Sequence, residues 1–183
     1  MLGCARVNAA NRPVNLMGVP MVTGVTGLGD ERHWRGVGRG LRVRIGLVGC
    51  VKSKLTVASP ARDLYTSTLF VGRRRFVEAS CDRWFILSAK HGVVDPDAIL
   101  EPYDETLKTA SRAARRAWSQ RVLSALDAEL GDISGLCFET HAGAEYLEYG
   151  VADGLLQRGA TAHNPTQGMR IGEQLSFYSG KRS

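Results

Sequence analysis

The fold is indicated by the stretch Val43-Arg44-Ile45-Gly46-Leu47-Val48-Gly49-Cys50-Val51-Lys52-Ser53-Lys54. Its apolar run ends at Gly49-Cys50 and changes directly into a polar turn that carries two lysines around a serine. Buried parallel strands have this pattern, and the turn after such a strand lies at the sheet edge where ligands bind. We therefore predict the first strand of an α/β domain here, with a ligand site at its end.

Apolar segments alternate with helical patterns along the rest of the chain. Further strands are predicted at residues 84–88, 135–139 and 160–163, and helices at residues 67–79, 111–130, 144–157 and 171–178. Ser67 is a typical helix N-cap, and Gly131 is a typical helix stop. This alternation predicts a doubly wound, Rossmann-like, three-layer sandwich with about four parallel strands and right-handed crossovers.

Two segments between the strands carry predictions of their own. In the helix at residues 67–79, Arg73, Arg74 and Arg75 are expected on the solvated side, where they either stay in water or contact phosphate. Residues 93–107 show no regular pattern, and we expect a long loop there. A loop of that length inside a domain is more often a functional lid than a mere connection.

The net charge of +6 is spread unevenly along the 183 residues. Residues 1–42 contain six arginines, two acidic residues and eight of the 21 glycines, and we expect a disordered, basic, glycine-rich extension there. It is either an arm that contacts phosphate or a linker, including the case of a start codon assigned too far upstream. Residues 43–183 are nearly neutral and are predicted to form a single α/β domain.

Composition also bounds the setting of the protein. The four cysteines are scattered without a Cys-x-x-Cys pair, so neither a metal site, a bound cofactor nor a disulfide framework is expected. No apolar run approaches the length of a membrane span, and the N-terminus lacks the order of charged and apolar residues in a secretory signal. We expect a soluble cytoplasmic protein.

Polar residues follow each predicted strand, and the carboxyl ends of parallel strands meet at one edge of the sheet. The expected catalytic residues are His141, Lys90, Glu139 and Asp104. The expected substrate-binding residues are Cys50, Lys52, Ser53, Lys54, Arg62, Ser88, His91, Tyr103, Gly143, Tyr146, Gly168, Gly172 and Gln174. Lysines and helix N-termini would favour an anionic ligand such as a phosphate, and the glycines would permit close backbone approach.

Each of these residues also has a structural interpretation. The lysines of the first loop are alternatively solvated charges, and His141 alternatively braces the following helix. Cys50 is either a nucleophile activated at a helix N-terminus or a small buried apolar residue. The tyrosines either stack on a base or belong to the core.

Six ordered motifs in this chain resemble those of an uncharacterised bacterial and phage domain family. They stand at residues 47–54, 61–70, 84–92, 102–107, 141–146 and 170–175, so that the resemblance covers residues 43–178. That family is distantly similar to a peroxide-stress DNA-binding family and, in sheet layout, to uracil-DNA-glycosylase-like proteins. The resemblance implies an α/β domain with a site at the strand ends.

Two functions are compatible with these residues. The first is an enzyme that hydrolyses the N-glycosidic bond of a nucleotide or of modified DNA, with phosphate on the lysines and helix N-termini and a tyrosine stacked on the base. In it, His141 or Lys90 would stabilise the departing base while Glu139 or Asp104 polarises water. The alternative is a non-catalytic nucleic-acid-binding module that uses the arginine-rich helices and the basic extension at residues 1–42. A small-molecule sensor would use the same pocket.

Overall fold

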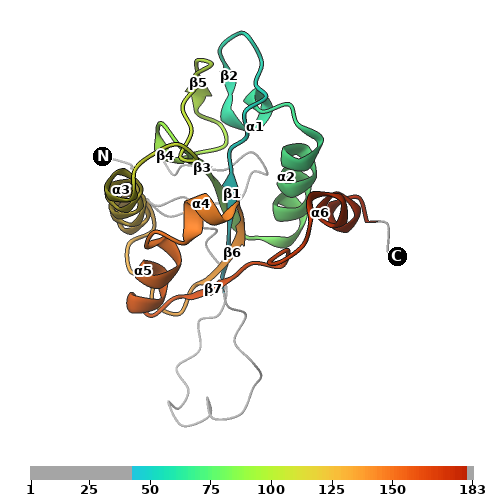
Figure 1. Cartoon of the computed structure of the whole chain (residues 1–183). Coiled ribbons are helices and arrows are strands. Elements are labelled where there is room, and N and C mark those ends of the chain that lie inside the picture. Colours follow the sequence, from blue (N-terminus) through green and yellow to red (C-terminus); the bar gives the residue numbers. More distant parts are fainter. Residues whose placement is uncertain (1–42, 181–183) are drawn as a thin grey trace, which may run out of the picture. The chain divides into compact units, whose positions relative to one another are not determined.

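Strand β1 (Arg44–Gly49) lies at the centre of a five-stranded sheet in the computed structural model, which describes residues 43–180 (Figure 1). The strand order is β4-β3-β1-β6-β7. Strands β3 (Arg83–Ser88), β6 (Cys137–His141) and β7 (Thr161–His163) run in the same direction as β1. The short β4 (Gly92–Val94) pairs antiparallel with β3 at one edge.

The α/β class is confirmed, and the sheet contains the four parallel strands expected together with one antiparallel strand that was not predicted. The extra strand is β4, which the chain enters through Gly92 at a φ of 76°. The third strand begins two residues later than predicted and continues through Glu139 to His141, all of it buried after Cys137. Its polar residues indicated the end of a strand, but they lie inside the protein.

Helices cover both faces of the sheet. Figure 1 shows α2 (Thr68–Ser80) and α6 (Ile171–Tyr178) together on one side of it. On the other side lie α3 (Arg112–Leu130), α4 (Ala144–Leu147) and α5 (Val151–Gln157). The core between these layers is formed by apolar side chains of the central strands, among them Leu47, Phe85 and Phe138, which are almost fully buried.

The helix ends follow local chemistry. The Ser67 and Ser111 hydroxyls accept backbone N–H groups of the first turns of α2 and α3, and Gly131 ends α3 at a φ of 73°. The single helix predicted at residues 144–157 is instead two, α4 and α5. They are separated at Gly150, whose φ of 126° is incompatible with a continuous helix.

The segment 93–107 is partly ordered into structure rather than being a plain loop. Strands β2 (Ser59–Pro60) and β5 (Ile99–Leu100) pair antiparallel outside the main sheet, next to the short helix α1 (Ala61–Leu64). Backbone bonds from Ala61 and Arg62 to residues 96–98 anchor the segment. The following residues, through the buried Leu107, are thereby held beside the loop that leaves β1.

Two expectations from the sequence concern the N-terminal extension and the absence of a membrane span. The extension predicted at residues 1–42 lies outside the described residues, as do residues 181–183. Within residues 43–180, no helix has both the length and the apolar character needed to cross a membrane.

Candidate functional site

The loops that follow β1 and β6 border a pocket of about 630 Å³, which we call the strand-edge pocket. Its lining residues are Cys50, Val51, Lys52, Lys54, Leu69, Arg73, Asp104, Glu105, Thr106, Lys108, Thr109, Gly143, Glu145, Tyr146, Ile171 and Gln174. It lies at the carboxyl ends of the two adjacent central strands. The predicted convergence of loops is therefore observed for the β1 and β6 loops and for α6.

Arg73 is the most unusual residue of the strand-edge pocket. Its side chain is only 6 % exposed, and one guanidinium nitrogen donates to Gln174 Oε1 at 2.9 Å. The Nε atom has no hydrogen-bond partner within the described part of the chain, and no carboxylate there forms an ion pair with Arg73. Burial lowers the pKa of this group, and Tyr178, Glu145 and Tyr146 oppose that effect. A buried cation with a free donor is a candidate anion site.

The placement of Arg73 on the solvated side of its helix was wrong. In α2 it shares the buried face with Phe70 and Val77, at spacings of three and four residues. That spacing is visible in the sequence, but the prediction gave more weight to the run of three arginines, which is typical of a solvated helix face. Arg75, two residues along, is exposed as expected.

The two lysines of the first loop have different surroundings. The ammonium of Lys54 donates to the carbonyls of Val51 and Lys52 at 3.1 and 3.3 Å, and lies 4.4 Å from the centre of the Tyr103 ring. Lys54 therefore holds the loop in shape as well as lining the pocket. The side chain of Lys52 is exposed, and its ammonium has no hydrogen-bond or ion-pair partner among residues 43–180. Ser53 does not line the pocket.

A cluster of hydroxyl groups lies behind the first loop. The Tyr103 hydroxyl is 2.7 Å from both the Tyr65 hydroxyl and the Ser88 Oγ, and Trp118 Nε1 donates to the Ser88 carbonyl. Burial raises the pKa of Tyr65 to about 12 and raises that of Tyr103 as well. Both phenols are thus neutral at ordinary pH. Neither Ser88 nor Tyr103 lines the strand-edge pocket, so the cluster supports the loop.

Cys50 and Tyr146 form part of the pocket wall. Their sulfur and hydroxyl oxygen are 3.1 Å apart, and both side chains are buried except where they face the pocket. Burial raises the pKa of the Tyr146 phenol. Tyr146 also contacts Trp118 edge-on, which fixes its ring within the core and leaves its polar end beside Cys50.

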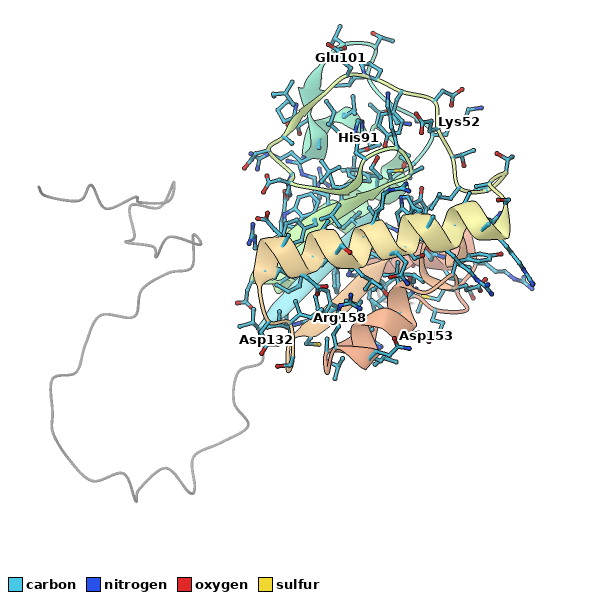
Figure 2. All side chains as sticks on the ribbon, turned by 90° about the vertical axis from the view of Figure 1, so that its left-hand side faces the viewer. Lys52, His91, Glu101, Asp132, Asp153 and Arg158 are labelled. Carbon is cyan, nitrogen blue, oxygen red and sulfur yellow. The ribbon has the colours of Figure 1, made fainter. Side chains whose placement is uncertain are left out.

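Three further predicted residues, at the periphery of the domain, lie outside the strand-edge pocket. Lys90 is exposed, with its ammonium 4.0 Å from the carboxylate of Glu105, a residue of the pocket. His91 is also exposed, and partial burial together with Lys90 lowers the pKa of its ring. Arg62 pairs with Asp97 in the outer β2–β5 region. In Figure 2, Lys52 and His91 lie on one side of α3, while Asp132, Asp153 and Arg158 lie on the other.

His141 and Glu139 belong to a largely buried group that we call the histidine network: Glu139, His141, Thr166 and the half-buried Tyr178. His141 has no exposed surface, and its Nδ1 is 2.7 Å from the Tyr178 hydroxyl. Its Nε2 is 3.1 Å from a Glu139 oxygen, but the alignment is too poor for a hydrogen bond. The other Glu139 oxygen pairs with Arg44.

Burial makes the histidine a neutral group. It lowers the pKa of His141 to about 4, with Glu139 opposing and Arg73 adding to the effect. Neither His141 nor Glu139 lines the strand-edge pocket. The structure therefore does not bring these two predicted catalytic residues to the place where a ligand would bind, whereas it does place Asp104 there.

A second pocket, of about 440 Å³, adjoins the first at the ends of β6 and β7, and we call it the amide pocket. Its lining residues are Thr140, Ala142, Gly143, Ala144, Leu147, Glu148, Ala152, Asp153, Ala162, His163, Asn164, Thr166, Gln167, Gly168, Met169 and Gln174. Gly143 and Gln174 line both pockets. The predicted residue Gly168 is found here, whereas Gly172 lies on exposed α6 and lines neither pocket.

The sequence reading missed several lining residues. Lys108 and Glu145 line the strand-edge pocket, and Asn164 lines the amide pocket. Glu145 stands two residues after a predicted site glycine, and Asn164 directly follows the last strand, so their positions next to strand ends were the available signal. Among residues 43–180, no group of three His, Cys, Asp or Glu side chains is arranged to hold a metal ion.

Comparison with known sequences adds a family to this geometry. A family described as a family of unknown function, DUF6884, matches residues 45–180. No curated protein matches the chain. The matched region contains both pockets and the histidine network.

Proposed function

We propose a function from the site itself, since the chain belongs to DUF6884, a family of unknown function. The proposal is a nucleotide-processing enzyme that binds the phosphate of its substrate at Arg73 and hydrolyses the N-glycosidic bond. The observation that carries it is the buried guanidinium of Arg73, a residue of the pocket lining, which has an unpaired Nε donor and no carboxylate partner among the described residues. A phosphate supplies the charge and the acceptors that this group lacks.

The position of the pocket supports a nucleotide. The chain passes from β1 to β3 on one side and later to β6 on the other, so strand order reverses next to β1. We propose that the sheet is doubly wound and Rossmann-like, with the strand-edge pocket at the switch point. Ligands of such sheets bind in the crevice at that point. A cytoplasmic location and a nucleotide or nucleic-acid partner belong to the same proposal.

The carboxylates of the pocket supply the acid–base chemistry. A carbon placed on Gly143 would come within 2.4 to 2.9 Å of the Glu145 carboxylate, so this carboxylate lies directly over the glycine that joins the two pockets. We assign Glu145 as the general base that activates water. Asp104, another residue of the pocket lining, would stabilise the positive charge that develops on the sugar.

The reaction is a hydrolysis. The water oxygen bonds to C1′ of the sugar while the C1′–N bond breaks, and its electron pair leaves with the base. Glu145 takes the water proton, and the departing base is protonated from solvent or from a neighbouring group, so that free base and a sugar phosphate result. His141 does not touch the substrate in this scheme. It is a positioning residue that acts through Tyr178.

The test is release of free base from a panel of nucleoside monophosphates and modified DNA, followed by liquid chromatography. Arg73→Gln should reduce kcat/KM by about 100-fold, because it removes a charged hydrogen bond to phosphate. Arg75→Gln removes the same charge from an exposed position of the same helix, and should leave the rate unchanged. Thermal unfolding of both variants controls for folding. Intact substrate across the whole panel with the native protein would refute the enzyme.

The alternative, a nucleic-acid-binding module, relies on the arginine-rich helices, and two of their arginines are engaged elsewhere in the structure. Arg74 pairs with Asp63 and Glu78, and Arg115 donates to two backbone carbonyls while lying against the Tyr149 ring. These contacts favour the pocket over the helix surface as the place where a phosphate binds. A binding affinity that falls steeply with salt and ignores Arg73→Gln would favour the module.

A further inference from the structure

We infer that the amide pocket holds the nucleobase and selects bases with a lactam edge, in which a carbonyl lies beside a ring N–H. Guanine, hypoxanthine and uracil have this edge, whereas adenine and cytosine have an amino group in place of the carbonyl. The inference rests on the proposed function, because it takes the phosphate at Arg73 as the fixed end of the ligand.

The two pockets are arranged for one ligand that spans them. They meet at Gly143 and Gln174, and Gln174 also accepts a hydrogen bond from Arg73. Gly143 has an ordinary φ of −69°, so it is not required for a special backbone conformation. Because Gly143 has no side chain, the atoms nearest to this position at the boundary between the two pockets are those of the Glu145 carboxylate. A sugar placed there would join a phosphate in one pocket to a base in the other.

The apolar part of the amide pocket suits a flat ring. Four alanines contribute small side chains, and Leu147 and Met169 contribute larger ones. Small apolar side chains let a planar ring approach the backbone closely, and a thioether contacts aromatic rings favourably. The volume of about 440 Å³ accommodates a purine or a pyrimidine.

Asn164 presents a hydrogen-bond donor to this pocket. Its Oδ1 accepts the backbone N–H of Thr166 at 2.9 Å and the hydroxyl of Thr166 at 3.1 Å, and Thr166 is buried. A backbone N–H can only donate, so the amide oxygen must face Thr166 and the NH₂ group must face away. No partner for that NH₂ group exists among residues 43–180. Asn164 is half-buried, so this NH₂ group is free to donate to an acceptor of the ligand.

Two carboxylates provide hydrogen-bond acceptors in the amide pocket. Glu148 and Asp153 both line it, and neither forms an ion pair with a described cation. Figure 2 shows Asp153 on the side of α3 away from His91 and Lys52. A lactam offers a carbonyl to Asn164 and an N–H to a carboxylate. An amino-substituted edge would set N–H groups against the N–H groups of Asn164, which leaves both unpaired.

The test compares inosine and adenosine monophosphates, which differ only at this edge, by isothermal titration of the full chain. The inosine nucleotide should bind at least tenfold more tightly. Asn164→Asp keeps the acceptor for Thr166 but replaces the donor by an acceptor, so the preference should disappear or reverse. Gln157→Glu makes the same change of charge at an exposed position of α5 and should leave the preference intact.

The outcomes separate this inference from the proposed function. Equal affinity for the two nucleotides, lost in Arg73→Gln but unaffected by Asn164→Asp, would overturn the base selection while the phosphate site stands. Failure of both nucleotides to bind would overturn both proposals. Guanosine and uridine monophosphates, measured in the same way, should both exceed their adenosine and cytidine counterparts. Tighter binding of the amino bases would refute the assignment.

Discussion

The strand-edge pocket and the histidine network are neighbouring regions, and both contain the residue types that catalysis uses. The pocket exposes Arg73, Asp104 and Glu145 to a space that a ligand can enter, whereas His141 has no exposed surface. The Tyr178 hydroxyl joins the two regions, since it contacts His141 directly and interacts with Arg73. The presence of residue types that catalysis uses therefore does not by itself define a site. A site also needs a space that a ligand can enter and hydrogen-bonding groups that are not already paired.

The same chain of contacts gives the buried region an indirect role. From His141 it runs through Tyr178 to Thr166, at 2.7 and 3.4 Å, and Thr166 holds the oxygen of Asn164. The network thus supports both the phosphate residue and the proposed base-reading amide. The predictions below therefore distinguish residues that contact the ligand from residues that only hold those residues in place.

The largest effect is expected from Glu145→Gln, which keeps the shape of the side chain but removes the general base. We expect kcat for base release to fall by about 1,000-fold, equivalent to ~4 kcal/mol, with KM nearly unchanged. Glu101→Gln is the matched control, because Glu101 is exposed and lines neither pocket. An equal loss in the control, or an active Glu145→Gln, would assign the base to another residue.

The second effect is acid destabilisation through His141. The pKa of its ring is about 4 in the folded protein, below the ordinary value of 6.5, so the unfolded chain binds this proton first. The contribution is fully present above pH 6.5 and is lost as the pH falls to 4, by up to ~3 kcal/mol. Urea unfolding across this range measures it. The loss should be reduced in His141→Gln and retained in His91→Gln; equal slopes in both variants would contradict the assignment.

A smaller effect is expected from Tyr178→Phe. The change removes the hydroxyl that contacts His141 Nδ1 and Thr166, and leaves a buried ring nitrogen unsatisfied. The free energy of unfolding should fall by about 2 kcal/mol. Nucleotide affinity should fall only a few-fold, because no substrate contact is lost. A loss of affinity as large as that of Arg73→Gln would show that the two regions act as one site.

The smallest effect is expected from Gly143→Ala. The added carbon would meet the Glu145 carboxylate, and we expect base release to slow by about tenfold, or ~1.4 kcal/mol. Stability should change little, because the φ of Gly143 is ordinary. Gly172→Ala is the control: its added carbon meets open space in a helix, so it should be slightly stabilising and leave the rate unchanged. Equal rates for the two variants would argue against a ligand crossing at Gly143.

Much of the architecture was predictable because local pattern decides it. The apolar run at residues 43–49 became β1, and Ser67, Ser111 and Gly131 cap the helices as expected. The missed features depend on neighbours in space. Strand β4 exists because β3 offers it a partner, and the 144–157 helix is split at Gly150, which adopts a left-handed conformation.

The candidate site divides in the same way. Residue type and position after a strand were enough to place Cys50, Lys52, Lys54, Gly143, Tyr146 and Gln174 around one pocket. They were not enough for His141, whose polar strand end is covered by α2 and α6, where Phe76 and Tyr178 contact its ring. They also failed for Arg73, because three consecutive arginines on a helix point in three directions and only one of them faces inward.

Periodicity and turn chemistry, which act over a few residues, specify strands, helices and the edge on which their loops meet. Burial is different, because it depends on which distant segment lies on top of a side chain, and a residue's neighbours in sequence carry little information about that. The packing of α6 against α2 encloses His141, whereas Arg73 lines the strand-edge pocket. Tertiary structure thus decides which of the many polar residues line a pocket and which are buried away from it.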